Sequence, residues 1–390
     1  MQVPCIIFES QKREADEDQK ALTVSRNVPV QGGFSVRRKS VFALAAVLTV
    51  AAGLWLYRKF AAPPVIRAYT TIPEKEAAVL FQRFTDYTGL RVSFSRLSSG
   101  EMLRRVIAEK VCPQADLIIG GPADIYDAAK REGALARYVP EAAKAMPVGY
   151  RDPDNRWFGI GVTPLCFLVN RNFIEKNGLR MPDSWQDLLD PAYRGALQMV
   201  DPRASATASE QIYSLVRIYG EREAFEYQKK LAENVRAYAR NGVGGAMPVA
   251  LGQAAAGVFY YVDAMSLKLE GYPVEIVFPK EGVTYAVDGC ALLDGAASPE
   301  EAKYLLQWLA SQDFARSRME QKPCYLPACP ELRELNKLLD LNSIRLLQCS
   351  VPWKSQNRLR LIDRWTSEVA RSDQLKDSQD TVRSASVLQK

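Results

Sequence analysis

The sequence predicts an α/β protein with one apolar segment near its N-terminus. Two observations support this fold class. Apolar runs of strand length alternate with segments of helical spacing, and glycines or prolines separate them. Such alternation is typical of a parallel sheet covered by helices. The 390 residues suffice for two or three domains, and 47% hydrophobic with 25% charged residues is ordinary for a globular protein.

The N-terminal region predicts export across a membrane. A basic cluster at 37–39 precedes eighteen uncharged residues, 40–57, which would span about 27 Å as a helix. We expect residues 37–62 to be a signal peptide or an uncleaved signal-anchor, a transmembrane helix in either case. The chain after residue 62 would then be periplasmic or otherwise extracytoplasmic. Residues 1–36 form a polar leader, and one hypothesis is that translation starts near Val36.

The exported part reads as alternating strands and helices. The helix at 73–88 has its apolar residues at helical spacing and ends at Gly89, which favours a helix C-cap. Further helices are expected from Ser98, from Asp124 to Gly133, at 182–189, 209–219, 221–234 and 264–270, and from Pro299 onward. Strands are expected at 65–69, 90–94, 115–119, 159–170, 197–200, 257–261, 274–278 and 286–293.

The chain contains no histidine. This excludes Ser-His-Asp and Cys-His catalysis and histidine-based zinc or haem sites. The sequence also has no phosphate-binding P-loop and no GxSxG elbow, so we expect a binding protein without catalytic residues or a cofactor. The net charge of +6 is mild for this length and indicates no nucleic-acid partner. Cys324 and Cys329 are the one disulfide we predict, whereas Cys166 and Cys290 fit buried thiols.

Five stretches resemble one protein family. They read SSGEMLRRVIAEKVCPQADLIIGG, WFGIGVTPLCFLVNRNFI, PDSWQDLLDPAYRGALQMVDPRASATA, GVFYYVDAMSLKLEGYPVEIVFPKEGVTYAVDG and SPEEAKYLLQWLASQDFA. In this order they resemble periplasmic solute-binding proteins of ABC importers. The branch they resemble binds ferric iron, thiamine, sugar phosphates or 2-aminoethylphosphonate.

This resemblance implies the two-lobed periplasmic-binding-protein fold of type II. Lobe one would comprise residues 65–160 plus 288–390, and lobe two residues 161–287. A small-molecule solute would bind between the lobes, which close by a hinge motion. The partner would be an ABC permease in the inner membrane, and we expect a monomer.

Several residues are candidates for binding the solute. Hydroxyl groups and free backbone N–H groups at helix N-termini bind anions, and two such segments start at Ser98 and Ser205. Asp263 would receive an amine or hydroxyl of the solute, and one of two adjacent tyrosines would contact it. The expected ligand-binding residues are Ser98, Ser99, Gly100, Gly121, Thr163, Ser205, Thr207, Tyr260, Tyr261 and Asp263.

These groups favour a small anionic or zwitterionic solute, and a phosphonate or phosphate ester above others. In ferric-binding relatives a Tyr pair binds iron, commonly with a His, so one alternative is Fe³⁺ held by Tyr260 and Tyr261 with an exogenous anion. Thiamine or a thiamine phosphate is a second alternative. An exported hydrolase on the same scaffold is the alternative from another functional class.

Overall fold

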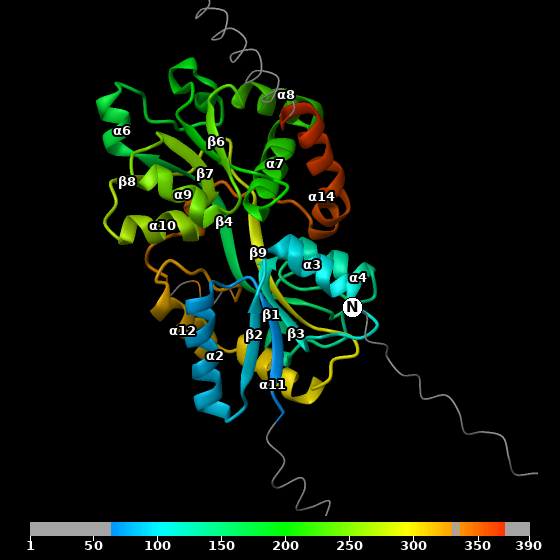
Figure 1. Cartoon of the computed structure of the whole chain (residues 1–390). Coiled ribbons are helices and arrows are strands. Elements are labelled where there is room, and N and C mark those ends of the chain that lie inside the picture. Colours follow the sequence, from blue (N-terminus) through cyan, green and yellow to red (C-terminus); the bar gives the residue numbers. More distant parts are fainter. Residues whose placement is uncertain (1–63, 330–332, 334–335, 371–390) are drawn as a thin grey trace, which may run out of the picture. The chain divides into compact units, whose positions relative to one another are not determined.

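The computed structural model describes residues 64–329, 333 and 336–370 (Figure 1). The predicted leader, 1–36, and the predicted export segment, 37–62, lie outside the described residues. Within the described ranges, no helix has the length and apolar character needed to cross a membrane.

The described strands form one hydrogen-bonded path in the order β2-β1-β3-β9-β4-β7-β5-β6, with β8 paired to β4. They are β1 (Ile66–Thr70), β2 (Val92–Arg96), β3 (Leu117–Pro122), β4 (Phe158–Asn170), β5 (Leu197–Val200), β6 (Val235–Ala239), β7 (Ala256–Tyr260), β8 (Val274–Val277) and β9 (Tyr285–Leu292). Strand β1 lies parallel between β2 and β3, and β5 lies parallel between β6 and β7. The expected parallel pairing is therefore confirmed toward both ends, whereas β4 and β9 run antiparallel to their neighbours.

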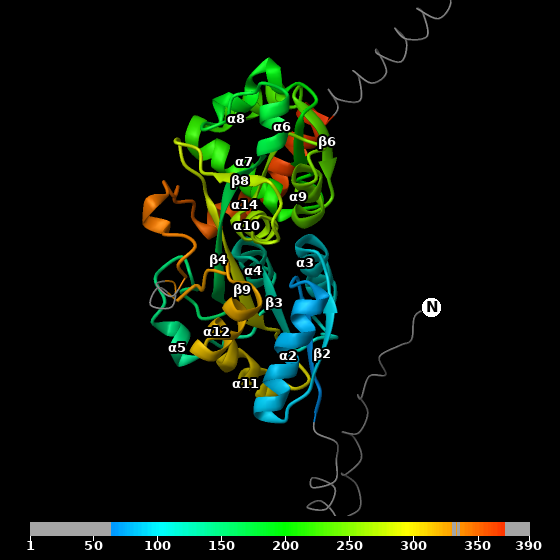
Figure 2. The same ribbon diagram turned by 90° about the vertical axis from the view of Figure 1, so that its left-hand side faces the viewer.

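Strands β4 and β9 connect two lobes. The first half of β4 pairs with β9, and its second half pairs with β7 and β8. Lobe one contains β1–β3, and lobe two contains β5–β8; they lie toward opposite ends of β4 and β9 (Figure 2). Lobe one carries α2 (Glu74–Thr88), α3 (Ser99–Ala108), α4 (Ala123–Arg131), α5 (Glu141–Lys144), α11 (Pro299–Leu309) and α12 (Gln312–Gln321). Lobe two carries α6 (Arg171–Lys176), α7 (Ala206–Tyr219), α8 (Glu221–Leu231), α9 (Gly242–Ala250), α10 (Tyr261–Leu269) and the 3-10 turns Gln186–Leu189 and Pro191–Tyr193.

Helix α2 forms as its spacing predicts. Leu80, Phe81 and Phe84 are buried on the side that faces the lobe-one core. Gly89 then adopts a φ of 75° and donates its N–H to the Thr85 carbonyl, which ends the helix as a left-handed cap. The predicted boundary of this helix is confirmed.

The helix expected at 182–189 is wrong in its first half. Only the 3-10 turn Gln186–Leu189 forms, because the Asp187 carboxylate accepts from the backbone N–H groups of Asp183 and Ser184, both at 2.9 Å. Those N–H groups are thus satisfied without a helix.

Helix α9 was not predicted, because its three glycines are poor helix formers. A Cβ at Gly245 would lie 2.9 Å from the Ala239 Cβ and 3.1 Å from the Phe259 ring. Glycine therefore lets α9 pack closely on the sheet, and Asn241 caps the helix by accepting from the Gly244 N–H at 2.7 Å.

The segment after α12 does not pack on lobe one alone. Ile344, near the 3-10 turn Leu341–Ser343, lies in a core of lobe two. Helix α14 (Val351–Trp365) and the π-helical turn that follows it, Thr366–Ala370, contact α4 and lobe two. The lobe boundaries at 160 and 288 stay a prediction, with this segment shared between the lobes.

The cysteines are only partly as predicted. Cys166 and Cys290 are buried free thiols, as expected. The predicted Cys324–Cys329 disulfide is wrong, because Cys324 is a free thiol that donates to the Val262 carbonyl at 3.4 Å inside the lobe-two core.

Candidate ligand-binding cleft

A cleft of about 550 Å³ lies between the lobes. Lobe one contributes the end of β3 and the starts of α2 and α3. Lobe two contributes the starts of α7, α9 and α10. The positive ends of several helix dipoles therefore face this space from both lobes.

Two of these helix starts, with the end of β3, form what we call the helix-start cradle: Ser98, Ser99, Gly121, Ser205 and Thr207. Ser98 and Ser205 cap their own helices, since their Oγ atoms accept from the N–H groups of Glu101 and Thr207, both at 3.3 Å. Each hydroxyl still has its proton to donate. The end of β3 turns through a φ of 75° at Gly121, which brings bare backbone to the cleft. This arrangement is suited to an anion.

Eight of the ten predicted site residues line the cleft. They are Ser98, Ser99, Gly121, Thr163, Ser205, Thr207, Tyr260 and Asp263. The other two do not line it. A Cβ at Gly100 would lie 3.5 Å from the Arg104 guanidinium on the same helix. Tyr261 is buried in a lobe-two core, with its ring 6.1 Å from that of Phe278.

Two carboxylates in the cleft have no hydrogen-bond or ion-pair partner among the described residues. Asp263, in α10, and Asp288, in β9, form no hydrogen bond or ion pair with any other described residue, although both keep some exposure to the cleft. Desolvation by the surrounding protein raises the pKa of Asp288 to about 6, and the negative charge of Asp263 adds to this rise. Desolvation also raises the pKa of Asp263. Such groups gain free energy from a cationic or hydrogen-donating ligand.

An ion-pair cluster that was not predicted from the sequence lines the lobe-one side of the cleft. Glu76 of α2 pairs with Arg318 of α12 at 2.9 Å and with Lys322, just after α12, at 3.6 Å. All three line the cleft, and the two cations partly offset the effect of burial on the Asp288 carboxylate. The spacing of Arg318 and Lys322 is that of neighbours on one helix face. It does not indicate that both side chains meet Glu76, which lies more than 200 residues earlier in the chain.

Tyr260 and Thr163 present unused polar groups. Their side-chain oxygens are buried and have no hydrogen-bond partner among the described residues. Burial, with the negative charges of Glu210 and Asp288, holds the pKa of the Tyr260 phenol well above its ordinary value. Since Tyr261 lies in the core, the Tyr pair does not bring two phenol oxygens to the cleft.

The side chains that could ligate a metal ion are the next feature of the site. Within the described ranges, no group of three or more His, Cys, Asp or Glu residues is placed to hold a metal ion. Fe³⁺ as a transported solute would meet one residue of the predicted Tyr pair, because Tyr260 lines the cleft and Tyr261 does not.

A family model described as "Bacterial extracellular solute-binding protein" matches residues 113–343. The chain belongs to this family. As a member it is a periplasmic solute-binding component of an ABC importer, which delivers a small molecule to a permease. The family consists of solute-binding proteins and not of enzymes.

Relatives and solved structures agree with this assignment. An uncharacterized protein of Haemophilus influenzae is 30% identical over 73% of this chain and 85% of its own length. A candidate 2-aminoethylphosphonate-binding periplasmic protein of Salmonella paratyphi A is 28% identical over 64% of this chain and 73% of its own. The periplasmic binding protein AfuA of Actinobacillus pleuropneumoniae, solved with fructose-6-phosphate, has a TM-score of 0.72 at 28% identity and covers 78% of this chain and 98% of its own. Iron-bound HitA of Pseudomonas aeruginosa, at 18% identity and a TM-score of 0.70 over 77% of this chain and 99% of its own, shares the fold.

Proposed function

We propose that this protein captures a small solute with a phosphonate or phosphate group at one end and an amine or hydroxyl donor at the other. The observation that carries the proposal is the pairing of two poles in one cleft. The helix-start cradle is suited to the anion, and the unpaired carboxylates of Asp263 and Asp288 are suited to the donor end. A zwitterion or a phosphorylated sugar satisfies both poles at once.

Two relatives support this class of solute. The Salmonella relative is named for 2-aminoethylphosphonate, and the AfuA structure holds fructose-6-phosphate. Each of these molecules has an oxyanion at one end and hydrogen-bond donors at the other. Ferric iron fits less well, because Tyr261 is buried away from the cleft and burial opposes ionisation of the Tyr260 phenol.

The test is isothermal titration and thermal melting of the full-length protein with matched ligands. 2-Aminoethylphosphonate is compared with ethylphosphonate, which lacks the amine, and with ethanolamine, which lacks the phosphonate. Fructose-6-phosphate, thiamine phosphate and ferric citrate complete the panel. A ligand at a thousand times its dissociation constant adds about 4 kcal/mol to the free energy of unfolding.

We expect 2-aminoethylphosphonate or the sugar phosphate to bind, and each truncated ligand to bind at least about tenfold more weakly. Ethylphosphonate binding as tightly as 2-aminoethylphosphonate would remove the role assigned to the two carboxylates. A shift with iron alone, together with a visible tyrosinate absorption band, would replace this proposal with the ferric alternative.

A further inference from the structure

Helix α14 is fixed to lobe two by its C-terminal half. Leu361 and Trp365 pack into an apolar cluster with Phe225 of α8. On the surface, Arg360 pairs with Glu221 of α8 at 2.6 Å. Figure 1 shows α14 beside α7, at the C-terminal end of the described chain.

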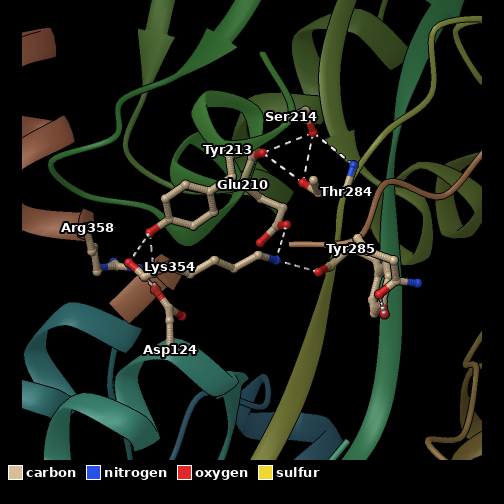
Figure 3. A network of polar contacts seen from close by, with 9 residues as sticks. Asp124, Glu210, Tyr213, Ser214, Thr284, Tyr285, Lys354 and Arg358 are labelled. Carbon is tan, nitrogen blue, oxygen red and sulfur yellow. Dashed lines mark hydrogen bonds and ion pairs between the residues drawn. The ribbon is translucent and has the colours of Figure 1, made fainter. Parts of the chain in front are cut away.

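The N-terminal half of α14 carries two buried cations (Figure 3). Lys354 pairs with Glu210 and donates to the Tyr285 carbonyl of β9 at 2.8 Å. Arg358 pairs with Asp124 at 3.0 Å. The side chains of these two ion pairs are at most 10% exposed, so water screens neither pair effectively.

The two anions that these cations bind belong to different lobes. Asp124 lies in the first turn of α4, three residues after Gly121 of the helix-start cradle. Glu210 lies in the first turns of α7, three residues after Thr207 of the same cradle. The Tyr213 hydroxyl of α7 also donates to Asp124 at 3.3 Å, so the lobes meet directly within the network. Helix α14 itself contributes no residue to the cleft lining.

We propose that α14 is an interlobe clasp, in which Lys354 and Arg358 are positioning residues that hold the two cleft walls at a fixed separation before the solute binds. A third contact, from the Arg131 guanidinium of α4 to the Ser355 hydroxyl at 2.7 Å, supports the same junction. Lobes of such proteins move about a hinge. A wall that is free to move spends less time in the binding-competent arrangement, and the apparent dissociation constant rises in proportion.

The test uses full-length variants in which both partners of a pair become neutral, so that no lone buried charge remains. The first is Asp124→Asn with Arg358→Met, and the second is Glu210→Gln with Lys354→Met. Arg360→Met is the matched control, because it removes an arginine from the same helix without touching lobe one. Far-ultraviolet circular dichroism confirms folding of each variant.

The first readout is the distance between the lobes without ligand, from single-molecule energy transfer. Dyes are attached through non-natural amino acids at Tyr87 of α2 and at Leu251, after α9, which are 77% and 55% exposed. The second readout is the dissociation constant for 2-aminoethylphosphonate. The distance measurement needs no ligand, so it remains decisive even if the proposed solute is wrong.

We expect either double variant to broaden the distance distribution and to weaken binding by about fivefold or more, while Arg360→Met changes neither. A distribution as narrow as wild type in both double variants would overturn the proposal. A broader distribution with tighter binding would also overturn it, because the helix would then hold the walls apart instead of preparing them. The second double variant keeps the test open if the first fails to fold.

Discussion

Replacing Gly121 with alanine separates the cost of backbone strain from the loss of ligand binding. Gly121 and Gly89 both have a φ of 75°, so an alanine at either position costs about 1–2 kcal/mol for its left-handed conformation. No atom lies within 4 Å of a Cβ at Gly89, which makes Gly89→Ala the control. A Cβ at Gly121 lies 3.0 Å from the Ser99 Oγ and 3.1 Å from the Thr71 Cγ2.

The new methyl group at Gly121 crowds both side chains, and we expect the Ser99 hydroxyl to shift out of its place in the cradle. Losing one hydrogen bond to a charged oxygen costs about 1.5–3 kcal/mol, which raises the dissociation constant about tenfold to 150-fold. Urea unfolding of both full-length variants measures the strain, and isothermal titration with the solute measures the affinity. Equal affinities for Gly121→Ala and Gly89→Ala would refute the placement of the anion at this cradle.

Three further predictions concern the cleft and the clasp. Ser99→Ala combined with Thr207→Val should weaken anion binding at least about a hundredfold in titration calorimetry, with the thermal midpoint nearly unchanged. Asp288→Asn should raise the free energy of unfolding at pH 7 by about 1–2 kcal/mol, after allowance for its partial exposure. The raised pKa of about 6 makes the wild type lose stability as pH rises from about 4 to 6, so urea titrations at pH 4 should show no gain for this variant. Arg358→Ala alone should cost about 3–5 kcal/mol in urea unfolding, because the buried Asp124 carboxylate loses its cationic partner and keeps only the Tyr213 hydroxyl. A cost under about 1 kcal/mol would contradict the burial of this pair.

The sequence predicted the parts of the fold that depend on local pattern. The apolar spacing of α2, the glycine cap at Gly89 and the long apolar strand β4 follow from neighbouring residues alone. Helix α9 and the turn around Asp187 were missed, because close packing at Gly245 and a side-chain hydrogen bond decide them.

Some residues of the candidate site could be predicted from local sequence, and others could not. Ser98 and Ser205 begin helices and could be found from their local sequence. Glu76, Arg318 and Asp288 reach the cleft from segments far apart in the chain, and only the tertiary arrangement brings them together. The two tyrosines could not be told apart from sequence, because Tyr260 ends β7 and Tyr261 begins α10.

Strand β4 belongs to the sheet of both lobes, so we expect the two lobes to fold together. All thirteen of its residues are buried. Its first half pairs with β9, and its second half pairs with β7 and β8. Neither lobe can therefore be excised as a separate fragment without leaving an open sheet edge on the other. We therefore expect the molecule to melt in one transition. We also expect lobe movement to twist β4 without breaking it, at the register shift between Gly159 and Gly161.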